Sequence, residues 1–315
     1  MNARSFDADV APGGYRWWYV DATSDDGRYG LTVIAFIGSV FSPYYALARR
    51  RRPGAADPHA HCAVNVALYG DKRRWTMTER GASALQRDAH SLRIGPSRLH
   101  WDGAALTIDL DEIGAPLPMR VRGSVRLHAP TLAQDAFALD AEGRHLWLPI
   151  APCARVEVRL SEPALHWHGD AYADSNAGSR ALEEDFTRWH WSRSNLRGGD
   201  TAVLYDVERR DGTPHSLALH FDADGGCRSF AAPAAHELPG TRWGIARATR
   251  SEGGTTPQAR TLEDTPFYAR SLLDTCLLGE PVHGVHESLD LERFRSGWVQ
   301  MLLPFRMPRR SAWAA

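Results

Sequence analysis

The stretch Val156-Glu157-Val158-Arg159-Leu160 alternates apolar and charged residues, and this two-residue period is typical of a strand with one buried face. The same alternation recurs in the stretches 106–110 and 217–221. Helical periodicity is sparse by comparison. The sequence therefore predicts an all-β protein with few short helices.

Tight turns separate several of these alternating stretches. Asp102-Gly103, Asp211-Gly212 and Asp224-Gly225 each lie between two of them, and these residue pairs tolerate the positive φ angles of two-residue hairpin loops. Antiparallel hairpins follow, and many short antiparallel strands favour a sandwich or a barrel. The period alone cannot choose between these two architectures, although a barrel with an apolar interior could hold an elongated apolar ligand.

The length of 315 residues favours two domains. One helix is predicted over Ser179–Trp191, where Leu182, Phe186 and Trp189 are three or four residues apart and Ser179 could serve as the N-cap. This helix falls near the middle of the chain. We therefore predict an N-terminal domain of residues 1–178 that carries the site and a C-terminal domain of residues 179–315.

Composition excludes several classes of function. The formal net charge of -1 provides no general attraction to nucleic acid, and we expect no nucleic-acid partner. The four cysteines are far apart and show no C-x-x-C spacing, which indicates free thiols and a cytoplasmic location. The first twelve residues do not resemble a secretory signal, and no apolar run approaches the roughly 20 residues of a membrane-spanning helix.

Histidine pairs raise the possibility of a metal site. His166 and His168 are two residues apart, so on a strand they would share a face, and His59 with His61 repeats that spacing. A carboxylate such as Asp174, or His190, could complete the ligand set. Such pairs also arise by chance in a chain with 14 histidines, and we assign no residue as a metal ligand.

A second cluster is better suited to moving a proton. His145 and Trp147 are two residues apart, as are Tyr172 and Asp174, so each pair would share one face of a strand. Two alternatives stay open from the residues alone. The first pair could simply fill the core, and the run Asp174–Asn176 could form an Asx-type turn instead of continuing a strand.

Long strings rich in Trp and Tyr resemble the carotenoid 1,2-hydratase family, also called hydroxyneurosporene synthase. They are Tyr15–Gly27, Gly30–Tyr45, His61–Gly70, Trp75–Gly81, Tyr172–Gly178, Trp189–Arg193 and Glu263–Tyr268. The resemblance covers nearly the whole chain, and strings of this length are far more specific than a short motif.

That resemblance implies two lipocalin-like β domains and an enzyme, a hydro-lyase that needs no cofactor. Its substrates would be water and an acyclic carotene such as neurosporene or lycopene, with water added across the terminal 1,2 double bond. The family's His-x-Trp and Tyr-x-Asp pairs match His145, Trp147, Tyr172 and Asp174. His190 departs from the family pattern, since a carboxylate is expected between the two tryptophans there.

Hydration of such an alkene begins with protonation, which leaves a tertiary carbocation. Asp174 is the natural acid, and it stays protonated at neutral pH only if burial raises its pKa well above that of an exposed aspartate. Trp147 would face the cation, Tyr172 would hold the water or orient Asp174, and His145 would relay a proton. Further residues expected to line the substrate are Trp167, His168 and Trp191.

Two other functions remain open. A lipocalin-like protein could carry an apolar ligand without reacting with it, although a carrier has little need of ionisable groups beside that ligand. A related enzyme could instead cyclise a terpenoid or polyketide on the same fold.

Two basic clusters, Arg49–Arg52 and the segment 306–310, have two interpretations. The ordinary one is a solvated loop and a frayed terminus. The other is peripheral contact with the lipid of the inner membrane, where a carotene would be dissolved.

Overall fold

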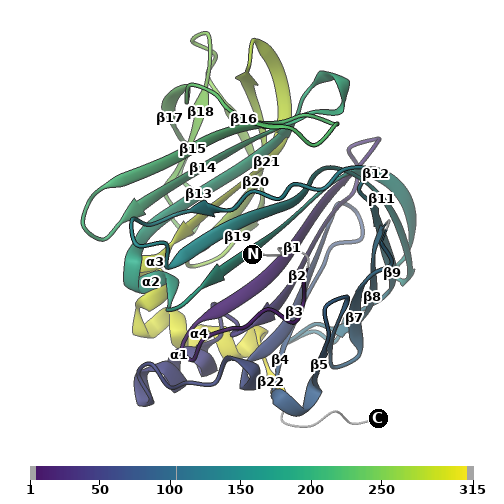
Figure 1. Cartoon of the computed structure of the whole chain (residues 1–315), viewed down its shortest axis with the longest axis vertical. Helices are drawn as coiled ribbons and strands as arrows, with labels where there is room; N and C mark the ends of the chain where they lie inside the picture. Colours follow the sequence, from purple (N-terminus) through teal and green to yellow (C-terminus); the bar gives the residue numbers. More distant parts are fainter. Residues whose placement is uncertain (1–4, 104, 311–315) are drawn as a thin grey trace. The chain divides into compact units, whose positions relative to one another are not determined.

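The computed structural model describes residues 5–103 and 105–310, which fall into two compact units (Figure 1). The first unit comprises residues 5–181 together with 301–310, and the second comprises residues 182–300. The predicted boundary after residue 178 stays a prediction, because a domain is a segment that folds independently and the division into compact units does not test independent folding. Both units are built of antiparallel sheets, which confirms the predicted all-β class.

In the described part of the first unit, thirteen strands form one sheet in the order β22-β4-β3-β2-β1-β12-β11-β9-β8-β7-β6-β5, with β10 beside β11. The strands are β1 (Tyr15–Ser24), β2 (Gly30–Ile37), β3 (Cys62–Tyr69), β4 (Arg74–Arg80), β5 (Leu85–Arg87), β6 (Ser91–Ile94), β7 (Ser97–Trp101), β8 (Ala105–Ile113), β9 (Arg120–His128), β10 (Phe137–Ala138), β11 (His145–Glu162), β12 (Ala164–Gly178) and β22 (Arg309–Arg310). Neighbouring strands are antiparallel except for β22 and β4.

This sheet curls, so that β4 approaches β8 and β9, which are distant from it in the strand order (Figure 1). A buried ion pair joins β4 to β8: Arg80 Nη2 on β4 lies 2.7 Å from Glu112 Oε2 on β8. Ser97 donates its hydroxyl to the other carboxylate oxygen at 2.7 Å. Both charged groups are therefore paired at the point where the sheet curls over.

The two faces of the first sheet differ in character. Alternate side chains of the central strands pack into one apolar core, to which β1 contributes Trp18 and Val20 and β12 contributes Ala171 and Ala173. The intervening residues, such as Tyr19, point to the other face. One strand therefore supplies both a core and a second, chemically distinct surface.

The second unit contains a seven-stranded sheet in the order β16-β15-β14-β13-β21-β20-β19 and a separate pair of strands, β17 and β18. The elements are α2 (Leu182–Asp185), β13 (Phe186–Asn195), β14 (Thr201–Arg209), β15 (Pro214–Phe221), β16 (Cys227–Ser229), β17 (Ala234–Leu238), β18 (Arg247–Ser251), β19 (Gln258–Asp264), β20 (Tyr268–Leu277), β21 (Glu280–Asp290) and α3 (Leu291–Arg295). The predicted hairpins at Asp211-Gly212 and Asp224-Gly225 connect β14 to β15 and β15 to β16.

The helix predicted over Ser179–Trp191 is wrong for most of its length. Only α2, four residues long, is helical, and β13 begins at Phe186. The helical spacing of Leu182, Phe186 and Trp189 competes with a two-residue period that buries Trp189 and Trp191, and pairing with β14 and β21 decides the outcome.

Two longer helices went unpredicted. α1 (Pro43–Arg51) begins where the Ser42 hydroxyl accepts hydrogen bonds from the backbone N–H groups of Tyr44 and Tyr45. α4 (Gly297–Arg306) contains Pro304 near its end. Single turns of 3-10 helix lie at Pro58–Ala60, Ala82–Ala84 and Arg197–Gly199. No helix among the described residues is long and apolar enough to cross a membrane.

Candidate active site

The His-x-Trp and Tyr-x-Asp pairs lie on neighbouring strands of the first unit. His145 and Trp147 open β11, and Tyr172 and Asp174 lie in the second half of β12. Antiparallel pairing sets Trp147 opposite Asn176, two residues from Asp174, so the two side chains meet on a diagonal. Asp174 therefore belongs to a strand and not to an Asx turn.

Asp174 receives two hydrogen bonds on a single oxygen. The Trp147 indole Nε1 donates to Oδ2 at 2.8 Å, and the Tyr172 hydroxyl donates to the same atom at 2.8 Å. All three residues are buried, with no exposed surface on Trp147 or Tyr172. Since both donors converge on Oδ2, the other oxygen, Oδ1, is where a proton on this carboxyl group would lie.

The site lies on the face of the sheet opposite the apolar core. Trp147, Tyr172 and Asp174 are absent from that core, whereas Leu148 and Ala173, beside them in sequence, belong to it. Aromatic rings surround the carboxyl group on this face: the Phe137 ring lies 5.4 Å from that of Trp147, and the Tyr19 ring lies 6.3 Å from that of Tyr172, measured between centroids.

His145 is fixed by two features that sequence reasoning missed. The Tyr15 hydroxyl on β1 lies 2.9 Å from His145 Nδ1, and both residues are buried. The His145 backbone N–H donates to Asp140 Oδ1 at 2.9 Å. Burial by itself would raise the pKa of Asp140, but this N–H and the Arg144 guanidinium together hold its pKa below the ordinary value.

Gly178 makes the contact between Tyr15 and His145 possible. It pairs with Tyr15 on one side and with His145 on the other. A Cβ atom at residue 178 would overlap the Tyr15 ring and lie 2.8 Å from His145 Nδ1. The alternation of Tyr15, Trp17 and Tyr19 could have signalled an aromatic face, but the strand pairing that delivers Tyr15 to His145 has no local signature.

The other predicted lining residues lie on β12 and β13. Trp167 points into the apolar core on the opposite face of β12. His168 shares the face of Asp174 but lies six residues earlier on β12, and more than half of its side chain is exposed. Trp191 is buried on β13 of the second unit, and His190 beside it lies 2.9 Å from Ser288 Oγ. Within the first unit, hydrogen bonds join Trp147 and Tyr172 to Asp174, and His145 lies two residues before Trp147 on β11.

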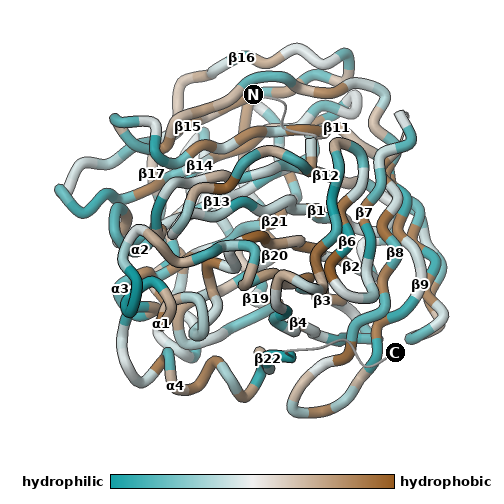
Figure 2. Tube along the Cα trace, turned by 60° about the horizontal axis from the view of Figure 1, so that its bottom comes forward, coloured by the Kyte–Doolittle hydropathy of each residue, from teal (hydrophilic) through white to brown (hydrophobic). Residues whose placement is uncertain are grey.

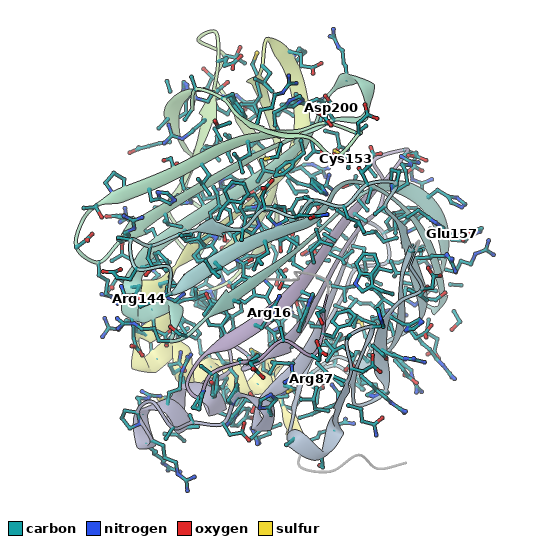
Figure 3. The ribbon with its side chains drawn as sticks, in the orientation of Figure 1. Arg16, Arg87, Arg144, Cys153, Glu157 and Asp200 are labelled. Carbon is teal, nitrogen blue, oxygen red and sulfur yellow. The ribbon has the colours of Figure 1, made fainter. Side chains whose placement is uncertain are left out.

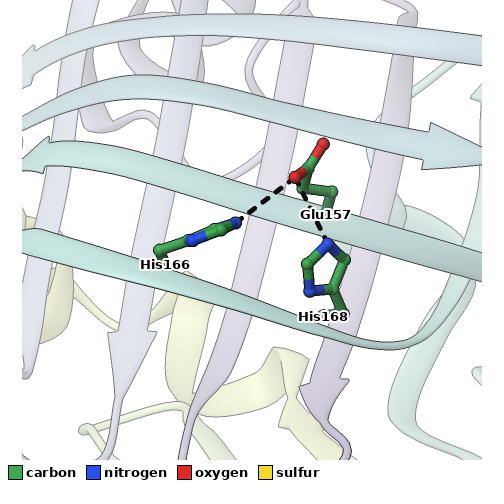
Figure 4. Close-up of side chains that lie close together, drawn as sticks. All are labelled: Glu157, His166 and His168. Atoms are coloured by element: carbon green, nitrogen blue, oxygen red, sulfur yellow. Dashed lines mark hydrogen bonds and ion pairs between the residues drawn. The ribbon is translucent and has the colours of Figure 1, made fainter.

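The predicted histidine pair belongs to a separate surface cluster. His166 and His168 lie on either side of the Glu157 carboxylate, with Nε2 to Oε1 distances of 3.3 and 3.2 Å (Figure 4). Glu157 points outward from β11 (Figure 3). The Arg159 guanidinium, and to a smaller degree His166, lowers the pKa of Glu157 to about 2. The three groups are near enough to share a metal ion, but Arg159 already pairs with the carboxylate oxygen that faces both histidines.

The other histidine spacing forms no such pair. His61 Nδ1 lies 2.9 Å from Glu79 Oε1, whereas His59 pairs with Asp57 and with Arg87. The two rings therefore have different partners.

Comparisons with known proteins place the chain in a family. The family model for carotenoid hydratase CrtC matches residues 33–315. A protein of Thiocapsa roseopersicina named acyclic carotenoid 1,2-hydratase is 57% identical over 96% of this chain and 75% of its own length. One of the same name from Rubrivivax gelatinosus is 51% identical over 98% of this chain and 77% of its own length.

The fold is also found in a solved structure. A candidate AttH protein of Nitrosomonas europaea has a TM-score of 0.61 and 15% identity, covering 91% of this chain and 94% of that one. At this identity the likeness concerns the fold alone. The sequence matches cover almost the whole chain, and the chain belongs to the carotenoid hydratase CrtC family.

Proposed function

We propose that this protein adds water across the 1,2 double bond of acyclic carotenoids such as neurosporene and lycopene, with Asp174 as the acid. The observation that carries the proposal is the convergence of the Trp147 and Tyr172 donors on Asp174 Oδ2 within a buried aromatic surface. Membership of the family and the two relatives named acyclic carotenoid 1,2-hydratase support it.

In the first step, Asp174 donates the proton of Oδ1 to C2 of the alkene. The C1–C2 π electrons form the new C–H bond, and the positive charge develops at C1, which carries two methyl groups and is therefore a tertiary centre. Carbocations of this kind are stabilised by the faces of aromatic rings. The rings of Trp147, Phe137 and Tyr19 lie on the same face as Asp174 and could serve this role.

In the second step, a water molecule forms a C–O bond at C1 and loses one proton. That proton returns to the Asp174 carboxylate, either directly or by way of His145 and Tyr15, whose Nδ1 and hydroxyl atoms are 2.9 Å apart. The acid is thereby regenerated. The addition of water is redox-neutral overall, so the proposal includes no cofactor.

We further propose that the protein acts from the cytoplasm as a peripheral protein of the inner membrane. The support is the nature of the substrate: a long apolar polyene partitions into lipid, so an enzyme that takes it up must meet the bilayer surface.

A product assay tests the hydratase proposal. Purified protein is mixed with lycopene or neurosporene dispersed in detergent, without added cofactor, and 1-hydroxy products are separated by chromatography. Asp174→Asn should remove the product, because the amide cannot donate a proton of comparable acidity. The matched control is Asp170→Asn on the same strand and face, where the carboxylate is exposed and pairs with Arg155.

Each outcome has a clear meaning. Product from the wild type and from Asp170→Asn, with none from a folded Asp174→Asn, would support both the reaction and the acid. Equal turnover by all three proteins would overturn the assignment of Asp174. Tight carotene binding with no product in any of them would instead favour a non-catalytic carrier.

A further inference from the structure

Helix α4 exposes an unusual number of large apolar side chains. Met301 is 74% exposed and Phe305 is 70% exposed, and Leu302 between them is also exposed. Trp298, one turn earlier, continues the same stripe along the helix, since residues three, four and seven apart share a helical face. Figure 2 shows brown, hydrophobic segments along α4.

The opposite side of α4 is apolar as well. Val299 is buried and Leu303 is partly buried. Met307, the residue that follows the helix, is also buried. The exposed and the buried sides of α4 are thus both largely apolar, and a largely apolar helix normally lies in an apolar environment. In α4 that environment exists on one side only, which points to a surface that is covered when the protein works.

Basic side chains adjoin this stripe. Arg306 and Arg310 are exposed, and the Arg306 guanidinium lies 4.2 Å from the centroid of the Trp75 ring. The Arg309 guanidinium lies 5.9 Å from the centroid of the Tyr44 ring, so the segment that follows α4 is a neighbour of α1. The two basic clusters seen in the sequence therefore lie on neighbouring parts of the first unit.

Helix α1 contributes the same mixture of groups. Arg50, Arg51 and Arg52 are exposed at its end, and Leu47 is exposed one turn earlier. Arg49 differs, because it is buried and its guanidinium lies 4.6 Å from the centroid of the Tyr45 ring. Three of the four arginines in the α1 cluster are therefore directed to solvent.

We propose that these residues form a docking face for an anionic lipid bilayer. The docking face comprises Leu47, Arg50–Arg52, Met301, Leu302, Phe305, Arg306 and Arg310. Apolar side chains of this kind enter the boundary between headgroups and acyl chains, while arginines attract anionic headgroups. The proposal deepens the proposed function, because a carotene dissolved in the bilayer would be delivered at this face.

Vesicle flotation tests the docking face without using the enzyme activity. Carotene-free vesicles of phosphatidylglycerol and phosphatidylcholine are floated with the full-length protein at low salt, and vesicles of phosphatidylcholine alone serve for comparison. Two variants address the two kinds of group: Met301→Ser with Phe305→Ser, and Arg50→Ser with Arg51→Ser. The matched control is Leu117→Ser with Met119→Ser, which removes two exposed apolar residues from the loop between β8 and β9.

The wild type and the loop control should float with anionic vesicles and far less with phosphatidylcholine alone. The apolar variant and the arginine variant should each bind anionic vesicles about tenfold more weakly than the wild type. Addition of 0.5 M NaCl should weaken the binding of the wild type to these vesicles by a similar factor. Because every substituted side chain is exposed, all variants should keep the wild-type melting temperature.

Flotation of both variants at the wild-type level would overturn the docking face. So would a wild-type dimer in sedimentation that becomes a monomer in the apolar variant, since a second copy would then cover the stripe. The hydratase proposal fails separately: a protein that floats normally but makes no product retains the docking face and loses the assigned reaction. With detergent-dispersed carotene, both variants should turn over at the wild-type rate.

Discussion

Trp147 and Asp174 are joined across β11 and β12 by a hydrogen bond of 2.8 Å from the indole Nε1 to Oδ2. The bond fixes which carboxyl oxygen faces the indole. Trp147 therefore has two separable roles: its ring could stabilise a cation, and its N–H orients the acid.

Trp147→Phe separates these contributions because it keeps an aromatic ring and removes the donor. Loss of a buried hydrogen-bond partner costs about 1–3 kcal/mol, so initial rates on lycopene should fall about 5- to 150-fold. The matched control is Trp101→Phe, where the indole belongs to the apolar core of the same unit. Equal rates in the two variants would contradict the role of the N–H group.

Gly178→Ala should disturb His145 without touching Asp174. The added methyl group would overlap the Tyr15 ring and crowd His145 Nδ1, which breaks the contact between those two side chains. If His145 relays a proton, the initial rate should fall at least as far as in Tyr15→Phe. Gly81→Ala is the control, because no atom lies within 4 Å of its added Cβ. A wild-type rate in Gly178→Ala would show that this contact does not serve turnover.

The ion pair at the point where the first sheet curls over should be sensitive to removal of one partner. Glu112→Leu leaves the buried Arg80 guanidinium uncompensated, and the free energy of unfolding should fall by about 3–5 kcal/mol. Urea titration of Glu112→Leu, Arg80→Met and the double variant checks this expectation. The double variant should recover much of the loss, whereas Asp71→Ala, at an exposed pair with Arg28, should cost less than about 1 kcal/mol.

The second unit should lose stability in mild acid because it holds two histidines, the buried His286 and the partly buried His190, in their neutral form. Burial lowers the pKa of His190 from 6.5 to about 4 and that of His286 from 6.5 to about 3. Below pH 6.5 the unfolded chain binds protons that the folded unit does not. Stability should therefore fall as the pH drops towards 4, by about 1.4 kcal/mol per pH unit for each histidine.

Thermal melting between pH 7 and 4 measures this effect. Replacing both histidines by glutamine should flatten the dependence of the melting temperature on pH, even if the variant is less stable overall. Replacing the exposed His283 should leave the slope unchanged. A slope that persists in the double variant would assign the acid sensitivity to other groups.

The sequence predicted the strands and turns because both depend on local chemistry. The alternation at 156–160 became part of β11, and the Asp102-Gly103 pair connects β7 to β8. The same local reasoning failed at Phe186–Trp191, where a helical spacing and a strand period coexist and only tertiary pairing separates them.

Prediction of the site was limited in a similar way. The spacing of Tyr172 and Asp174 places them on one face, and the structure agrees. Which strand lies beside them depends on pairing between residues that are distant in sequence, so Tyr15 could not be recognised as the partner of His145. The same spacing rule places Trp167 on the face opposite Asp174, since the difference between their positions is odd.

The two faces of β12 impose a constraint on how such a protein can change over generations. Odd-numbered residues in the second half of the strand hold the core together, and even-numbered residues carry the carboxyl group and its phenol partner. Substitutions on one face can therefore accumulate with little effect on the other. Insertion or deletion of a single residue in β12 would exchange the two faces of the strand. Asp174 would then point into the apolar core and Ala173 to the face of the site, so folding and chemistry would be lost together.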